Sequence, residues 1–298
     1  GLLATSLYNF FSCLLRALGN STVPLVFLAV SAILNIAWDL LFVAVFQLGI
    51  AGAAYATIFA QYVSGIGILL YVLFRCRSLL PERKDLRFDG EILKEIAGLS
   101  SLTCLQQSVM NFGILMVQGL VNSFGATTMA AFAAAVKIDT FAYLPVQDFG
   151  NAYSTFVAQN YGAGNKERIR RGTKESFAIS TAFSLVISAL VFAFAAPLMQ
   201  IFVSSAETAV IASGVRYLRI EGAFYFGIGC LFLLYGYYRA IKRAEMSVVL
   251  TVISLGIRVL LAYVLSATFL GETGIWMAIP IGWILADLTG LLYMRKTW

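Results

Sequence analysis

Three polar residues near the start of the chain have the types and spacing of a small cation site. Asn35 and Asp39 are four residues apart in an apolar run, so a helix would place both on one face. Asp39 lies about 12 Å, and Thr57 about 8 Å, from the outer ends of two consecutive antiparallel runs. The three side chains can therefore meet. A carboxylate, an amide carbonyl and a hydroxyl offer oxygens that suit Na⁺, and the carboxylate can instead take a proton. The alternative is that Asp39 only locks helix packing.

Four amide side chains form a second pattern, in the run 98–124. Gln107, Asn111, Gln118 and Asn122 fall within about 60° of one another at 100° per residue. They make one narrow polar stripe on an otherwise apolar helix. Such a stripe either joins neighbouring helices through hydrogen bonds or lines a cavity, and we expect a cavity.

Charged side chains inside apolar runs form a third group, because such a residue usually faces a cavity or a partner. Lys137 and Asp139 lie near the middle of the run 128–161, which Pro145 is expected to kink, and they suit either a structural or a proton-responsive role. Arg258 lies about 17 Å into a later run and needs an acidic partner. Asp139 and Glu221 are the candidates at comparable depth, with Asp287 a weaker third. The expected substrate cavity comprises Gln107, Asn111, Gln118, Lys137, Asp139, Asn151, Glu221 and Arg258.

Several kinds of chemistry are excluded by composition. The chain has no histidine, which removes His-based acid–base catalysis, the Ser-His-Asp and Cys-His arrangements and His-ligated metals. The four cysteines are scattered without a CxxC pair, and the stretch AQNYGAGN lacks the Lys-Ser/Thr ending of a phosphate loop. We therefore expect no catalytic residues, no enzyme, no cofactor, and no metal beyond Na⁺ at Asn35, Asp39 and Thr57.

Membrane-spanning helices are predicted to hold these residues in place. Of the 298 residues, 60% are hydrophobic and 12% charged, and the mean hydropathy is +0.85; soluble domains carry about 25% charged residues. An apolar run of about 20 residues spans the bilayer as a helix. Nine such runs predict an all-α membrane protein: 1–18, 24–47, 50–75, 98–124, 128–161, 176–203, 213–238, 246–268 and 274–294.

The positive charges support this count and set an orientation. After the odd-numbered spans the chain carries 17 of its 21 Lys and Arg residues, and the connections on the other side carry none. By the positive-inside rule we expect the carboxyl terminus to be cytoplasmic, and we expect the protein to lie in the plasma membrane. The net charge of +6 does not indicate binding to nucleic acid. The charged stretch 78–97, with a surface helix from about Asp89, is predicted to be a cytoplasmic linker between 1–77 and 98–298.

An internal repeat supports two lobes. Aligning Arg16 with Arg239 matches a span ending in Arg-Ala, a cytoplasmic turn, two further spans and the glycine pairs Gly49/Gly52 and Gly271/Gly274. Three more spans precede the second copy. We therefore expect a twelve-span protein of two six-span lobes, of which the first three spans are absent here.

The chain resembles the multidrug and toxic compound extrusion (MATE) transporters over nearly its whole length. The resemblance rests on SCLLRALGNSTVPL, ILNIAWDLLFV, GIAGAAYATIFAQ and VAQNYGAGNKERIRRG, in family order. It implies that Asn35, Asp39 and Thr57 belong to a cation site of the first lobe, which in the family an acid on the first span completes. The acids of a second-lobe cation site in some subfamilies have no expected counterpart here.

The resemblance implies a function as well. It implies efflux of small amphipathic or cationic organic compounds by antiport with H⁺ or Na⁺, through alternating access between two lobes. The expected partners are a small-molecule substrate and the lipid bilayer, and we expect a monomer. Two alternatives stay open: a flippase for lipid-linked precursors with a related two-lobe fold, and an inactive truncated fragment.

Overall fold

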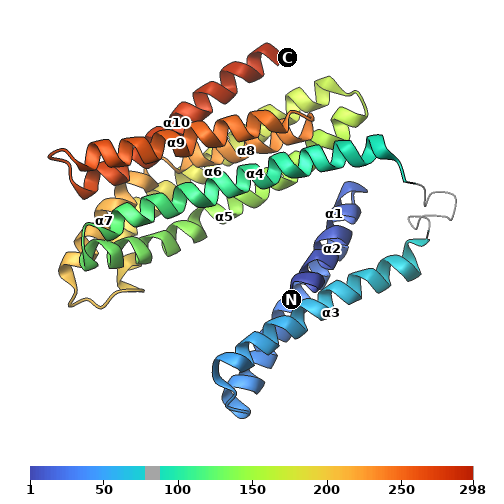
Figure 1. The fold of residues 1–298 in the computed structure, drawn as a ribbon, viewed down its shortest axis with the longest axis horizontal. Coiled ribbons are helices and arrows are strands. Elements are labelled where there is room, and N and C mark those ends of the chain that lie inside the picture. The colour runs from blue at the N-terminus through green and yellow to red at the C-terminus, as the bar shows by residue number, and fades with distance from the viewer. Residues whose placement is uncertain (78–87, 298) are drawn as a thin grey trace. The chain divides into compact units, whose positions relative to one another are not determined.

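The computed structural model describes residues 1–77 and 88–297, which fold into helices joined by short connections. The chain divides into two compact units, Gly1–Gly90 and Glu91–Trp298 (Figure 1). The larger unit holds most of the buried side chains, and each unit has a hydrophobic core of its own.

The N-terminal unit is a bundle of three helical segments. They are α1 (Leu2–Ala17), α2 (Thr22–Asp39), continued by the π-helix η1 (Leu40–Val45), and α3 (Gly49–Arg75). Leu15, Ile68 and Val72 form its buried core, where α1 packs on α3. Gly65 permits the close approach, because a Cβ at that position would lie 2.7 Å from the carbonyl oxygen of Ala4.

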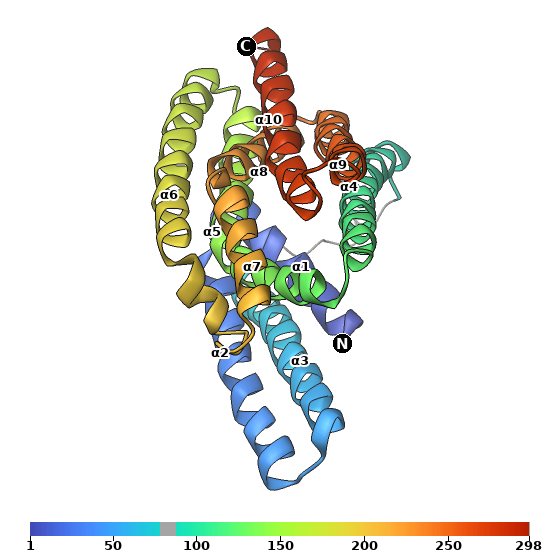
Figure 2. The same cartoon turned by 90° about the vertical axis from the view of Figure 1, so that its left-hand side faces the viewer.

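The C-terminal unit contains seven helices. In chain order they are α4 (Gly90–Asn122), α5 (Ala126–Gly162), α6 (Lys166–Gln200), α7 (Thr208–Gly222), α8 (Tyr225–Ala240), α9 (Ala244–Ser266) and α10 (Glu272–Thr297). Figure 2 shows α6 at one edge of this unit and α4 with α9 at the other, and α5, α7, α8 and α10 lie between them.

Aromatic stacking ties three of these inner helices together. The indole of Trp276 on α10 stacks on Phe132 of α5 at a centroid distance of 5.5 Å. Tyr217 of α7 meets both rings edge-on, at 5.7 and 4.9 Å. Such geometry adds about 0.5–1.5 kcal/mol per pair beyond the area buried. It fixes α7 beside the buried polar residues of this unit.

One expected span is broken. The run 213–238 consists of α7 and α8, which meet at an angle of 52°. Helical hydrogen bonding stops after Gly222, and Phe224 has the non-helical angles φ −117° and ψ 19°. Glu221 is the second-last residue of α7, so this acid lies at the end of a half-helix.

The prediction of nine spans is not reproduced by the described helices. Seven of them are long and apolar enough to cross a membrane, and α7 with α8 makes an eighth. The expected first span, α1, has 16 residues. At 1.5 Å per residue it is about 24 Å long, shorter than the hydrocarbon core of about 30 Å.

Two local predictions are corrected, and part of a third cannot be compared. The surface helix expected from Asp89 is not separate, because α4 runs without a break from Gly90 into the span. The helix α5 continues through Pro145, whereas a kink occurs in α6 at Phe194, three residues before Pro197. A proline ring clashes with the preceding turn, which accounts for that position. Residues 78–87 of the expected linker lie outside the described residues.

The turn between α8 and α9 is joined to the first turns of α4. The Lys242 ammonium contacts the Glu95 carboxylate in an exposed ion pair. This hydrogen bond raises the pKa of Lys242 above its usual value. The contact therefore stabilises the folded state fully at a pH below the ordinary lysine pKa. This stabilisation is lost as the pH rises through the raised pKa of the folded state.

Candidate functional site

In the N-terminal unit the structure brings two of the three expected cation ligands together. The Asn35 amide donates a hydrogen bond to the Thr57 hydroxyl at 3.5 Å, and this hydroxyl donates to the Ala53 carbonyl at 3.0 Å. Asp39 lies one turn further along α2, as its last residue. Its Oδ1 atom is buried and has no hydrogen-bond partner among the described residues. A carboxylate oxygen therefore remains available for a ligand.

The C-terminal unit contains a cavity of about 400 Å³ inside its helix bundle. Residues from six helices line it, namely α4, α5, α7, α8, α9 and α10. Most of the lining is apolar or aromatic, and it includes Phe132, Phe232 and Trp283. The charged groups in the wall are two carboxyls, Asp139 and Glu221, and one guanidinium, Arg258.

The two carboxyls lie next to each other and are almost fully buried. Asp139 is 3% exposed and Glu221 is 6% exposed. The Tyr225 hydroxyl donates a hydrogen bond to Asp139 Oδ1, and Tyr217 neighbours both carboxyls. Asp139 Oδ2 and Glu221 Oε2 have no hydrogen-bond partner among the described residues. Buried unpaired oxygens are costly, so this acid pair is suited to take up a proton or a cation.

Arg258 is the cation that faces the acid pair. It interacts electrostatically with both carboxyls. Within the part of the chain that the structure describes, no nitrogen of Arg258 lies within 4.0 Å of a carboxylate oxygen, and its Nε is buried without a partner. Asp287, the third candidate partner, lies outside this cavity beside Cys230. When both acids are ionised, the two carboxylates and the guanidinium sum to a net charge of −1.

The other predicted cavity residues are distributed over several places. Gln118 lines the 400 Å³ cavity, whereas Gln107 and Asn111 are exposed on the C-terminal unit. Lys137 lines a different cavity, and Asn151 accepts a hydrogen bond from Arg239 at 3.4 Å. Of the eight expected cavity residues, the structure therefore places four in this cavity: Gln118, Asp139, Glu221 and Arg258.

Tyr217 and Tyr225, which neighbour the acid pair, are not among the residues predicted from the sequence. Tyr217 and Glu221 are four residues apart on α7, which places them on one helix face, and Tyr225 follows four residues later, beyond the break. That spacing was the available signal. Buried tyrosine hydroxyls usually need a hydrogen-bond partner, and an intramembrane acid is an obvious candidate.

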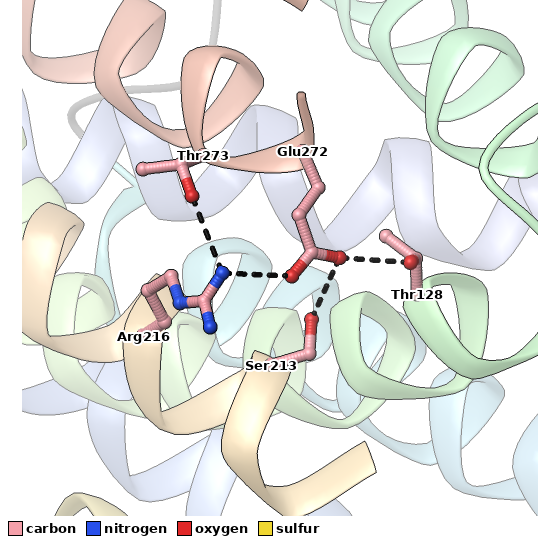
Figure 3. A network of polar contacts seen from close by, with 5 residues as sticks. All are labelled: Thr128, Ser213, Arg216, Glu272 and Thr273. Carbon is pink, nitrogen blue, oxygen red and sulfur yellow. Dashed lines mark hydrogen bonds and ion pairs between the residues drawn. The ribbon is translucent and has the colours of Figure 1, made fainter. Parts of the chain in front are cut away.

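A second polar network joins α5, α7 and α10 in the C-terminal unit (Figure 3). Glu272 of α10 accepts hydrogen bonds from Thr128 of α5 at 2.8 Å and from Ser213 of α7 at 3.1 Å. Its other oxygen accepts from Arg216 at 3.4 Å, and Arg216 also donates to the Thr273 hydroxyl. The carboxylate links α5, α7 and α10 where α5 and α10 begin.

Comparison with known proteins gives consistent matches. Residues 102–264 match the MatE family model. The chain is 33% identical over 291 residues to the probable multidrug resistance protein YpnP of Bacillus subtilis, covering 97% of the chain and 64% of YpnP. It is 27% identical over 304 residues to the probable multidrug resistance protein NorM of Thermotoga maritima, covering 98% of the chain and 64% of NorM. The chain therefore spans less than two thirds of these relatives.

A solved structure has the same fold. The MATE transporter VcmN of Vibrio cholerae superposes with a TM-score of 0.91 at 23% identity, and the match covers 99% of this chain and 66% of VcmN. The family model covers more than half of the chain, across α4 to α9 of the C-terminal unit. The chain is a member of the MatE family of membrane transporters.

Proposed function

We propose that this chain is part of a secondary active efflux transporter for small amphipathic or cationic organic compounds. In this proposal it is a monomer in the plasma membrane, its carboxyl terminus is cytoplasmic, and it belongs to a twelve-span protein whose two lobes are connected by a cytoplasmic linker, 78–97. Substrate leaves by antiport with H⁺ or Na⁺ as the two lobes alternate access. The relatives named as probable multidrug resistance proteins support the direction and the substrate class.

The observation that carries the proposal is the buried acid pair in an aromatic cavity. Two carboxyls facing one guanidinium hold a net charge of −1 when ionised, so one proton or one monovalent cation makes the cavity neutral. A cationic organic substrate could do the same, while its apolar part contacts Phe132, Phe232 and Trp283. Competition for one negative charge is the property that antiport requires.

The cation site proposed for the N-terminal unit serves the same purpose. Asn35, Asp39 and Thr57 offer one amide, one carboxylate and one hydroxyl, and Asp39 Oδ1 has no hydrogen-bond partner among the described residues. We propose that ion uptake occurs both here and at Asp139 and Glu221. The second site departs from the expectation that the second lobe would hold only an ion pair.

The flippase alternative is less well supported by the cavity. A pyrophosphate on a lipid-linked precursor needs several cations, whereas this cavity wall has one guanidinium against two carboxyls. A comparison of the full-length protein with the 298-residue chain tests the alternative that the chain is an inactive fragment.

The test measures efflux of a fluorescent cationic dye from proteoliposomes under separately imposed Na⁺ and H⁺ gradients. It compares the full-length protein, with the three spans that the resemblance implies restored, with the 298-residue chain alone. The variants are Asp39→Asn and Glu221→Gln, and Asp287→Asn is the matched control because this buried acid lies outside the cavity lining.

Three outcomes distinguish the proposals. Gradient-driven efflux that is lost in Asp39→Asn and Glu221→Gln but kept in Asp287→Asn supports antiport and identifies the ion. Efflux that survives both substitutions refutes the role of these acids. If the full-length protein moves no dye but scrambles a lipid-linked precursor, the flippase is correct, and if only the chain alone fails, the fragment is inactive.

A further inference from the structure

A second cavity in the C-terminal unit is not used by the proposed function. Its volume is about 610 Å³, and it shares only Ala133 with the cavity of the acid pair. The first turns of α5, the connection after α6 and the start of α7 form its wall. Four alanines of α5 leave the space open because their side chains are small: Ala126, Ala130, Ala133 and Ala134.

Lys137 lies at the end of this alanine face that is farther from the start of α5, and its side chain is exposed. It is 11 residues from the start of α5, or about 16 Å along the helix axis. Helical side chains point toward the helix N-terminus, so the ammonium extends back toward the cavity mouth. It lies 5.7 Å from the centre of the Phe202 ring, just beyond the end of α6. This is how a lysine snorkels from the membrane interior to the interface.

The cavity contains one cation and one anion that do not pair with each other. Among the described residues, neither Lys137 nor Glu207 makes an ion pair within 4.0 Å. Glu207 is exposed at the N-terminal end of α7 and lines the same cavity. An unpaired lysine inside a membrane-spanning segment is unfavourable, and the Lys137 side chain is exposed to a ligand. The arrangement therefore suits a ligand that brings an anion to Lys137 and a cation to Glu207.

We propose that this cavity binds the headgroup of an aminophospholipid such as phosphatidylethanolamine. The lipid phosphate binds Lys137, and the primary ammonium, which lies nearer the water, donates to Glu207. The depths of the two residues match the order of these groups in a lipid, with the phosphate below the amine. The apolar wall of alanines, Phe202 and Val203 accepts the glycerol and the upper acyl chain. The Thr127 and Ser204 hydroxyls supply further donors to phosphate oxygens.

The charge pattern also predicts which lipids are rejected. Phosphatidylglycerol has the phosphate but no cation, so Glu207 repels it. Phosphatidylcholine has both charges, but its quaternary ammonium has no N–H to donate to Glu207. The proposal needs the membrane-spanning fold but not transport activity, so it can fail while the proposed function holds.

The test titrates the purified full-length protein in detergent with lipids of identical acyl chains and counts bound lipid by native mass spectrometry. The lipids are phosphatidylethanolamine, phosphatidylcholine and phosphatidylglycerol, and soluble phosphoethanolamine is the competitor. The variants are Lys137→Ala and Glu207→Gln. Lys174→Ala and Glu245→Gln are matched controls, because both residues are exposed and lie outside this cavity.

We expect one phosphatidylethanolamine to bind more tightly than either other lipid. Lys137→Ala should weaken it by about tenfold or more, because a charge-assisted contact to phosphate is lost. Glu207→Gln should remove the preference over phosphatidylcholine, and the controls should change neither. Equal binding of all three lipids, or binding unchanged in Lys137→Ala, overturns the proposal. Full displacement by phosphoethanolamine at equal concentration also overturns it, because the acyl chains would then contribute nothing.

Discussion

Replacing Glu272 with alanine should destabilise the C-terminal unit more than its partly exposed position suggests. The ion pair with Arg216 is 3.4 Å long, its side chains are 53% and 20% exposed, and it contributes about 0–1 kcal/mol. The larger effect comes from the two hydroxyls that donate to Glu272 Oε2. Thr128 and Ser213 are each 6% exposed, so both would lose a charged acceptor in a buried place.

The two hydroxyls differ in what they can do afterwards. Ser213 lies within α7 and can turn to the carbonyl of the preceding turn. Thr128 is the third residue of α5, so the residue four positions before it, Phe124, lies outside the helix. Thr128 should therefore stay unpaired, at about 1–3 kcal/mol. Together with the lost ion pair we expect about 1–4 kcal/mol for Glu272→Ala.

The assay is thermal unfolding of the full-length protein in detergent. At about 2–4 °C per kcal/mol, Glu272→Ala should lower Tm by about 2–16 °C. Glu245→Ala is the matched control, because Glu245 also lies in the first turn of its helix but has an exposed side chain. It should lose only the helix-dipole interaction, about 0.3–1 kcal/mol. Equal shifts in the two variants would refute the reasoning, as would Thr128→Val leaving Tm unchanged.

Further substitutions test the packing and the acid pair by the same assay. Gly282→Ala should lower the free energy of unfolding by about 1–3 kcal/mol, because a Cβ there would lie 2.3 Å from the Ser254 carbonyl oxygen. Gly256→Ala should stabilise its helix by about 0.5–1 kcal/mol, because no atom lies within 4 Å of the added Cβ. A Gly256→Ala variant less stable than Gly282→Ala would contradict this packing. Arg258→Gln should destabilise by about 3 kcal/mol by leaving two buried carboxylates without a cation, and adding Glu221→Gln should restore most of this loss; additive losses would argue against the coupling. Tyr225→Phe removes the hydroxyl that donates to Asp139 and should cost about 1–3 kcal/mol, whereas an unchanged Tm would show that this hydrogen bond contributes nothing to stability.

The helical architecture could be predicted from hydropathy because a lipid-facing helix must be apolar over a fixed length. The exceptions are places where that length rule does not act. At α1 the apolar run is real but the helix has only 16 residues. Between α7 and α8 the run is apolar enough to cross a membrane as one span, yet the backbone bends by 52° after Gly222. Hydropathy measures how favourably side chains transfer into lipid, and it carries no information on where a helix ends or bends. The length of α1 and the bend between α7 and α8 could therefore not be predicted from it.

The candidate site was predictable only within single helices. The four-residue spacing places Asn35 and Asp39 on one face, and the depth of Arg258 suggested Asp139 and Glu221 as partners. That these two acids lie next to each other, on α5 and α7, follows from tertiary packing between distant parts of the chain. The Trp276 stack on Phe132 and Tyr217 holds α7 there, and a single sequence carries no direct signal for such a contact.

The π-helical turn Leu40–Val45 has a consequence for the lengths of related sequences. Its hydrogen bonds reach back five residues, as in the bond from the Phe46 N–H to the Leu41 carbonyl at 2.9 Å. Such a turn holds one residue more than an α-helical turn, so it equals a one-residue insertion into a helix. A relative that builds this turn as an α-helix should show a single gap between the positions of Asp39 and Gly49. The length of this short segment therefore marks which relatives share the geometry around Asp39.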